Sequence, residues 1–369
     1  MKQPKLRLLL TADAVGGVWQ YSVDLARGLS RLNVETMLAI MGPSPSKAQL
    51  AMASGVKGLT LVDTGLPLDW LAHTPESVRS AGEAIANLAD RHSADIVQLN
   101  SPALAAEAEF PVPVVAVNHS CLATWWAAVK QGPMDAAFEW RAQLGSEGLR
   151  KADRVVTPSA AFSEATRAAN GLSALPTTVH NGRTPLALPR VAPHDFAFTA
   201  GRLWDKGKNA ATLDQAAADL PVPLYMAGPT EGPNGDSVQL EHARGLGNLG
   251  EKELVRWLAA RPVFVSAALY EPFGLAVLEA AAAGCPLVLS NIPTFRELWD
   301  GVATFVDPMD PKAYAKAVEA IVGDDYLRTA MGAAAKERAS RYTPEAMARD
   351  MLEIYVELAA PARDGKVAA

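Results

Sequence analysis

Cysteine is scarce in this chain of 369 residues, which contains only Cys121 and Cys285. Neither stands in a spacing typical of metal sites. So few cysteines indicate a reducing compartment in which both thiols are buried as small apolar side chains. Long apolar runs are also absent, since none approaches the roughly 20 residues that span a bilayer. We expect a cytoplasmic protein. A peripheral contact with the inner face of the membrane needs only a local basic or apolar patch and stays open.

Excess positive charge is lacking as well, because the net charge is −6 and the isoelectric point is near 5.6. This balance argues against nucleic acid as the main partner. The apolar content of 49% and the charged content of 20% are typical of a globular protein. The oligomeric state cannot be inferred from these numbers.

The length is too great for a typical single domain and suits two. Apolar runs such as "LRLLLT" (6–11) and "RVVTPS" (154–159) alternate with helical patterns, and the alternation restarts at "FAFTAGR" (196–202). Valine-, isoleucine- and leucine-rich runs that alternate with helices are typical of parallel sheets covered on both faces. The proline-rich segment 181–195 has no clear period, and we interpret it as a linker.

We therefore expect an α/β protein with two doubly wound, Rossmann-like domains that face each other across a cleft. The predicted domains are residues 1–185 and 186–342, followed by a helix from the capping signal Thr343-Pro344-Glu345. Ligands of open α/β sheets bind at the carboxyl ends of the strands. The loops after strands are therefore the places to look for chemistry.

Two such loops lie in the first half. Gly16 and Gly17 separate a strand from a helix, where the backbone can approach a ligand closely and the helix N-terminus can bind an anion. This unit lacks the G-x-G-x-x-G fingerprint, which disfavours a dehydrogenase, and a tight turn without a ligand is the alternative. His119 ends an apolar run and should project into the cleft, although a lone histidine is often structural.

The second half contains the other two loops. "GRLWDKGKN" (201–209) carries Arg202, Lys206 and Lys208, whose dispersed positive charge suits a diphosphate; a solvated basic loop is the alternative. "YEPFGLAVLEAAAAGCPLVLS" (270–290) places an anion-binding helix N-terminus after a strand. The amides available there are those of Phe273, Gly274 and Leu275.

Glu271 and Glu279 flank this helix start, and Glu279 is the only charged residue from position 273 to position 290. A lone buried carboxylate is costly unless several donors meet it. The two adjacent hydroxyls of a ribose would supply donors, in which case Glu279 is unpaired while the cleft is empty. An ion pair with a buried arginine or lysine is the alternative.

Together these motifs resemble the family 4 glycosyltransferases, which share the GT-B fold. The resemblance covers nearly the whole chain, and the Glu271-x7-Glu279 pair is its most specific feature. His180 departs from a frequent proline, and Ala267-Ala268 departs from a common Pro-Ser pair, but neither change removes a proposed ligand. Further similar segments are "HNGRT" (180–184), "ADRVVTPS" (152–159) and "TFRELWDGVATFVDP" (294–308).

The resemblance implies roles for the candidate residues. The donor diphosphate would be bound by Gly16 and Gly17 from one domain and by Arg202 with a lysine from the other. The loop spacing leaves that lysine open between Lys206 and Lys208, with a slight preference for Lys208. Glu271, helped by the amides of residues 273–275, would bind hydroxyls of the transferred sugar, and Glu279 would bind the ribose. His119 would lie near the sugar and the acceptor. Backbone groups near Leu249 and Gly250 would bind the nucleobase.

The resemblance also implies transfer with retention of anomeric configuration and without a bound metal or other cofactor. No Asp-x-Asp motif stands at a strand end, which agrees with the expected absence of a metal. We expect front-face attack in which the leaving phosphate takes the proton of the acceptor. Closure about residues 183–195 would exclude water, and the helix 343–360 would cross back to the first domain.

The expected reaction is hexosyl transfer from a nucleotide sugar to a hydroxyl of a glycan, glycolipid or small molecule, in surface or exopolysaccharide synthesis. The expected donor is UDP-glucose first and GDP-mannose second. Trp125 and Trp126 could stack on an acceptor sugar or belong to the core or an oligomer surface. Two alternatives remain: a GT-B sugar-nucleotide epimerase or hydrolase, and a non-catalytic nucleotide-sugar-binding protein, which would need neither Glu271 nor His119.

Overall fold

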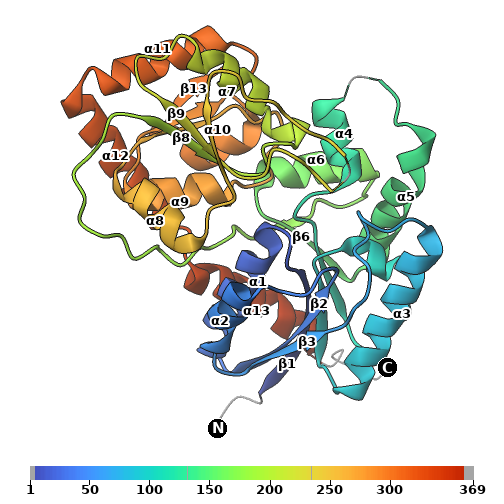
Figure 1. Cartoon of the computed structure of the whole chain (residues 1–369). Helices are drawn as coiled ribbons and strands as arrows, with labels where there is room; N and C mark the ends of the chain where they lie inside the picture. The colour runs from blue at the N-terminus through green and yellow to red at the C-terminus, as the bar shows by residue number, and fades with distance from the viewer. Residues whose placement is uncertain (1–4, 131, 234, 361–369) are drawn as a thin grey trace, which may run out of the picture.

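The computed structural model describes residues 5–130, 132–233 and 235–360, which form two parallel β-sheets covered by helices (Figure 1). The first sheet has seven strands in the order β3-β2-β1-β4-β5-β6-β7, and the second has six in the order β10-β9-β8-β11-β12-β13. Both are doubly wound, since the strand order reverses beside the first strand of each sheet. The predicted α/β class with two Rossmann-like domains is confirmed. We refer to them as the first and the second domain.

The first domain contains one short 3₁₀ turn besides its strands and helices. Its strands are β1 (Leu6–Asp13), β2 (Val34–Met41), β3 (Leu59–Asp63), β4 (Ile96–Leu99), β5 (Val114–Val117), β6 (Arg154–Thr157) and β7 (Thr177–Thr178). Its helical segments are α1 (Gly17–Ser30), α2 (Lys47–Ser54), α3 (Pro75–Arg91), η1 (Pro102–Ala105), α4 (Leu122–Val129), α5 (Ala136–Lys151) and α6 (Ala160–Asn170).

The second domain follows the same alternation. Its strands are β8 (Ala197–Ala200), β9 (Leu224–Ala227), β10 (Arg244–Gly247), β11 (Val263–Ser266), β12 (Leu287–Ser290) and β13 (Thr304–Val306). Its helical segments are η2 (Lys206–Lys208), α7 (Ala210–Ala217), α8 (Glu251–Ala259), α9 (Leu275–Ala283), α10 (Pro293–Trp299), α11 (Pro311–Val322) and α12 (Asp325–Ala339), followed by α13 (Pro344–Ala359).

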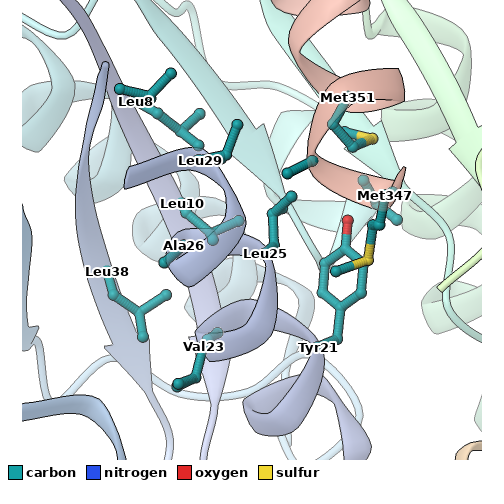
Figure 2. Close-up of a cluster of buried hydrophobic side chains, with 14 of the residues drawn as sticks. Leu8, Leu10, Tyr21, Val23, Leu25, Ala26, Leu29, Leu38, Met347 and Met351 are labelled. Carbon is teal, nitrogen blue, oxygen red and sulfur yellow. The ribbon is translucent and has the colours of Figure 1, made fainter. Parts of the chain in front are cut away.

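Strand β1 shows why a continuous apolar run forms a central strand here. Side chains alternate between the two faces of a strand, and helices cover both faces of this sheet, so both sets must be apolar. Leu8 and Leu10 pack with α1 and α13, where Leu29 and Met351 meet them (Figure 2). Leu9 belongs to the core on the opposite face, under α3.

The chain crosses between the domains twice, and the two crossings touch. The amide of Arg183 donates to the carbonyl of Tyr342 at 3.2 Å. A side chain at Gly182 would lie 2.1 Å from the carbonyl oxygen of Thr343, so only glycine permits this approach. After the second crossing α13 packs against α1, close enough that a β-carbon at Gly28 would lie 2.6 Å from that of Ala348.

Candidate functional site

The loops after β1, β5, β8 and β11 contain most of the predicted site residues. These loops lie at the carboxyl ends of strands near the centre of their sheets. Short strands and glycine-containing turns place polar groups directly after buried apolar residues. The structure brings the loops after β8 and β11 into direct contact with each other and with the start of α9.

Lys208 and Glu271 form the closest polar pair of this region. Lys208 Nζ lies 2.5 Å from Oε2 of Glu271, and the two side chains are only 24% and 16% exposed. Both line a small cavity together with Gly201 and Val277. Lys206, in contrast, points outward with a side chain that is 55% exposed and lies 3.6 Å from Asp236. The geometry therefore favours Lys208 over Lys206 as a ligand-binding cation.

Arg202 lies close enough to the end of β1 for its charge to act on Asp13. Its side chain is 44% exposed and its Nη2 lies 3.3 Å from Oδ2 of Asp205. Burial raises the pKa of Asp13, opposed by hydrogen bonds from the amides of Val15 and Gly16 and by the charge of Arg202. The first and second domains thus approach each other at this point with opposite charges.

The Gly16-Gly17 turn meets the start of α9. A β-carbon at Gly17 would lie 3.3 Å from Cδ1 of Leu275, whereas one at Gly16 would meet no atom of the described residues within 4 Å. Gly16 is the N-cap of α1 in an extended conformation. Gly17 therefore contacts the second domain, while Gly16 faces open space in which a ligand can approach the backbone.

Helix α9 begins with Gly274 in the left-handed region, at φ +94°. Glycine adopts this conformation without strain, so the helix starts immediately after a sharp turn. Phe273 is buried, with its ring 5.7 Å from that of Tyr342. Its side chain thus belongs to the core, and any ligand contact must come from backbone groups at the helix N-terminus.

Gly250 has a local structural role. Its amide donates to Oε2 of Glu253 at 2.9 Å and so caps the start of α8. Gly245, Gly247 and Gly250 do have the G-x-G-x-x-G spacing. The first two lie within β10, at the edge of the sheet, rather than in a loop between a strand and a helix. The spacing here therefore does not have the structural context of a dinucleotide-binding turn.

Glu279 has a protein partner, so the prediction that it is unpaired in an empty cleft is wrong. Arg183 Nε donates to Glu279 Oε1 at 2.7 Å, and its Nη1 donates to Asp24 Oδ2 at 2.9 Å. Burial raises the pKa of Glu279, and Arg183 opposes that rise. The alternative of a buried ion pair is what the structure shows. Asp24, a lone acid on the apolar face of α1, was the available sequence signal for such a network.

His119 follows β5 and is neutral at physiological pH. Burial lowers its pKa to about 3, and its ring stands edge-on to Tyr21 with centroids 4.3 Å apart. Nε2 lies 3.0 Å from Oδ1 of Asn100, whose Nδ2 is bonded to the carbonyl of Thr11. The Asn100 oxygen can only accept, so Nε2 carries the proton and Nδ1 is the acceptor nitrogen.

The two adjacent tryptophans of α4 differ in their partners. Trp125 Nε1 donates to Oδ1 of Asp205 at 3.0 Å. Trp126 Nε1 is buried and has no hydrogen-bond partner among the residues that the structure describes. Lys130 Nζ lies 5.9 Å and 5.7 Å from the two ring centroids. Trp125 therefore contacts the second domain.

Three further expectations can be compared with the structure. Cys285 is buried as predicted, but Cys121 is only partly buried. Within residues 5–130, 132–233 and 235–360, no three His, Cys, Asp or Glu side chains are grouped as a metal site would require. In the same part of the chain, no helix has the length and apolar character needed to cross a bilayer.

Comparisons with known proteins match both domains. Residues 15–184 match the family described as Glycosyltransferase Family 4, and residues 194–338 match Glycosyl transferases group 1. A D-inositol 3-phosphate glycosyltransferase of Corynebacterium urealyticum is 32% identical over 174 residues, which are 42% of this chain and 40% of that protein. A glycogen synthase of Mycobacterium tuberculosis is 29% identical over 262 residues, 64% and 61% of the two chains. The chain thus spans less than two thirds of these relatives.

Among solved structures, an Anabaena protein, Alr3699/HepE, in complex with UDP-glucose is similar with a TM-score of 0.74. The match covers 96% of this chain and 100% of that chain at 18% identity. At that identity the similarity establishes the fold over nearly the whole length of both proteins.

Proposed function

The chain belongs to the family 4 glycosyltransferases and has the GT-B fold, and on this premise we propose that it transfers a hexosyl group from a nucleoside-diphosphate sugar to an acceptor hydroxyl. The observation that carries the proposal is the Lys208–Glu271 pair beside the N-terminus of α9. It combines a cation for a phosphate with a carboxylate for sugar hydroxyls in one partly buried place.

In this proposal Arg202, Lys208 and the N-terminal amides of α9 bind the donor diphosphate. As the glycosidic bond breaks, negative charge grows on the leaving phosphate. Fixed cations and helix dipoles stabilise that charge without reorganisation, which is usually the largest catalytic contribution. The proposed reaction needs no metal, and unchanged activity after treatment with EDTA would support this part.

Glu271 binds hydroxyls of the transferred sugar rather than attacking its anomeric carbon. Its bond with the Lys208 ammonium lowers the nucleophilicity of the carboxylate but leaves its oxygens able to accept hydrogen bonds. The acceptor hydroxyl then attacks from the face of the leaving group, its proton passes to the leaving phosphate, and configuration is retained. A glycosyl-enzyme trapped on Glu271 would contradict this mechanism.

Glu279 accepts the ribose hydroxyls while Arg183 holds the carboxylate. Its side chain is still 13% exposed, and the charge of Arg183 opposes the rise in its pKa that burial causes. The neutral His119 offers Nδ1 as an acceptor for a hydroxyl of the donor sugar or of the acceptor. In both cases, buried partners fix the orientation of the side chain that would bind the ligand.

The donor proposal is UDP-glucose first and GDP-mannose second. The Anabaena protein of the same fold, solved with UDP-glucose, motivates this order of testing. The relatives are named for two different acceptors, an inositol phosphate and glycogen. We therefore keep the acceptor class as a hydroxyl of a glycan, glycolipid or small molecule.

A thermal-shift screen with UDP- and GDP-sugars tests the donor, because a bound donor raises stability by mass action. Mass spectrometry of the products then separates transfer from epimerisation and hydrolysis. We expect Glu279→Ala to weaken donor binding and Arg202→Ala to lower turnover by at least about 100-fold. Wild-type behaviour of both variants would refute the site, and no stabilisation by any sugar nucleotide would refute the function.

A further inference from the structure

Helix α4 of the first domain is bonded to both loops of the second domain that carry the proposed donor-binding groups. The indole N–H of Trp125 donates to Asp205 in the loop after β8 at 3.0 Å. Thr124 in the first turn of the same helix and Ser120 just before the helix bond Tyr270 in the loop after β11. Each bond joins a residue of the first domain, the proposed acceptor side of the cleft, to a neighbour of a proposed donor-binding residue.

Asp205 connects Trp125 to other residues of the loop after β8. Its carboxylate is buried, with Oδ1 accepting both the Trp125 indole and the amide of Gly207 at 2.9 Å. The other oxygen accepts from Arg202 at 3.3 Å. One carboxylate thus fixes the 3₁₀ turn η2, which contains Lys208, and also restrains the guanidinium proposed to bind the diphosphate.

Gly207 connects the two loops. Its carbonyl oxygen accepts from the amides of Leu269 and Tyr270, at 2.9 Å and 3.2 Å. A β-carbon at Gly207 would lie 3.0 Å from Nε1 of Trp125, so the indole rests directly on this backbone. The loop that carries Lys208 and the loop that carries Glu271 are therefore joined by hydrogen bonds to the carbonyl of Gly207, and the Trp125 side chain from α4 covers this point.

Tyr270 closes the ring of contacts back to α4. Its hydroxyl lies 2.8 Å from Oγ1 of Thr124 and 3.0 Å from Oγ of Ser120. A tyrosine hydroxyl is protonated at physiological pH, and burial raises the pKa of Tyr270 further. The ring runs from α4 through Asp205 and Gly207 to Tyr270 and returns to α4.

We propose that Trp125 and Tyr270 are positioning residues that set Arg202, Lys208 and Glu271 relative to the acceptor side of the cleft. The inference rests on the proposed glycosyl transfer and adds residues to it. The Trp125 N–H is bonded to Asp205 and its indole lies against Gly207, and the proposal assigns it the alignment of the donor-binding loops in place of stacking on an acceptor sugar. Contact between α4 and the second domain then couples the acceptor side to the charges that act on the leaving diphosphate.

The chain contains a matched control for this proposal. Trp126 is the neighbour of Trp125 on the same helix, and its buried Nε1 has no hydrogen-bond partner in the described part of the chain. Phenylalanine at either position removes an indole N–H and keeps an aromatic ring. Only Trp125→Phe removes a bond to the second domain, so the pair isolates that bond from the general effect of losing an indole.

Hydrogen exchange of the full chain gives the first readout, and it needs no substrate. We expect Trp125→Phe to speed amide exchange in segments 205–209 and 268–271 by at least about threefold relative to Trp126→Phe, because local opening loses one restraint. Tyr270→Phe should act on the same two segments. Equal exchange in Trp125→Phe, Trp126→Phe and the wild type would overturn the proposal.

Kinetics give the second readout, with the sugar nucleotide identified by the thermal-shift screen. We expect Trp125→Phe to lower kcat by about tenfold and to change the acceptor KM by less than about twofold, since misplaced charges weaken transition-state stabilisation. Unchanged kcat in Trp125→Phe, with a raised acceptor KM in Trp125→Ala, would show stacking instead and refute the inference. If the wild type transfers no sugar, the proposed function fails, and hydrogen exchange alone decides the role of Trp125.

Discussion

Arg183 Nε lies 2.7 Å from Oε1 of Glu279, and the same guanidinium reaches Asp24 with Nη1. One cation from the linker therefore joins α1 of the first domain to α9 of the second. All three side chains are largely buried, at 8%, 13% and 1% exposure. The carboxylate with the proposed ribose role is thus held by the segment about which the domains would close.

Replacing Arg183 should destabilise the protein strongly. Arg183→Met leaves the buried Glu279 carboxylate without its cation, which typically costs about 3 kcal/mol or more of the free energy of unfolding. Denaturant titration measures that loss. Arg167→Met is the control, because Arg167 pairs with Glu164 on the surface and such pairs contribute about 0–1 kcal/mol. Equal stability of the two variants would show that the buried network is not needed.

The two lysines of the loop after β8 should behave differently. Lys208→Ala removes the partner of Glu271, so we expect donor binding to weaken by at least about tenfold, as for the loss of a charge-assisted bond. Lys206→Ala removes an exposed cation and should change binding by less than about twofold. Isothermal titration with UDP and UDP-glucose measures both. A larger effect of Lys206→Ala would reverse the assignment.

Gly16→Ala separates ligand contact from folding. In the part of the chain that the structure describes, a β-carbon at this position meets nothing within 4 Å, so the melting temperature should stay within about 2 °C of the wild type. If the turn approaches the donor diphosphate, the added methyl group should still weaken donor binding. Gly17→Ala is the comparison, since its β-carbon would press on Leu275 and disturb the contact between the domains. Unchanged donor binding in Gly16→Ala would remove this turn from the site.

Glu297 should make stability depend on acid pH. Burial acts to raise its pKa, but bonds from His180 and from the amides of Ala161 and Ala160 outweigh burial and hold the pKa below its ordinary value of 4.5. A lowered pKa in the folded state means that the carboxylate stabilises the fold above pH 4.5 and loses this effect as the pH falls further.

Glu297→Gln should therefore lower the free energy of unfolding at pH 7, and the difference from the wild type should shrink below pH 4.5. Denaturant titrations at pH 7 and pH 4 measure both. Glu164→Gln, at an exposed position on α6, is the control for losing one acidic charge. A difference that stays constant between the two pH values would contradict a stabilising carboxylate at Glu297.

Periodicity predicted the parts of the fold that repeat locally. The runs at 6–11 and 196–202 became the central strands β1 and β8, because burial on both faces demands continuous apolar sequence. Helices α2 and α6 were missed although local signals existed. Ser46 and Gln49 form a capping box, and Ser159 caps α6, which ends at the left-handed Gly171.

The partners of the site residues could not be predicted in this way. Arg183 meets Asp24 across 159 positions of sequence, and Trp125 meets Asp205 across 80. No spacing rule connects such residues, because only the docking of two domains brings them together. The sequence named Glu271, Glu279 and Lys208 as candidates but did not name Arg183 or Asp24. The geometry paired Glu279 with Arg183 and Glu271 with Lys208.

The contact between Gly182 and Thr343 bears on how the two domains can be recombined, in evolution or in protein design. The chain leaves the first domain and rejoins it at neighbouring points, so the second domain is one continuous insertion into a host that keeps both flanking segments. The segment between the two crossings is continuous and about 160 residues long, and one hydrogen bond joins its two ends. Such a segment is a natural unit for recombination. Exchanging it between relatives would move Arg202, Lys208, Glu271 and Glu279 together as one unit while leaving the first domain in place.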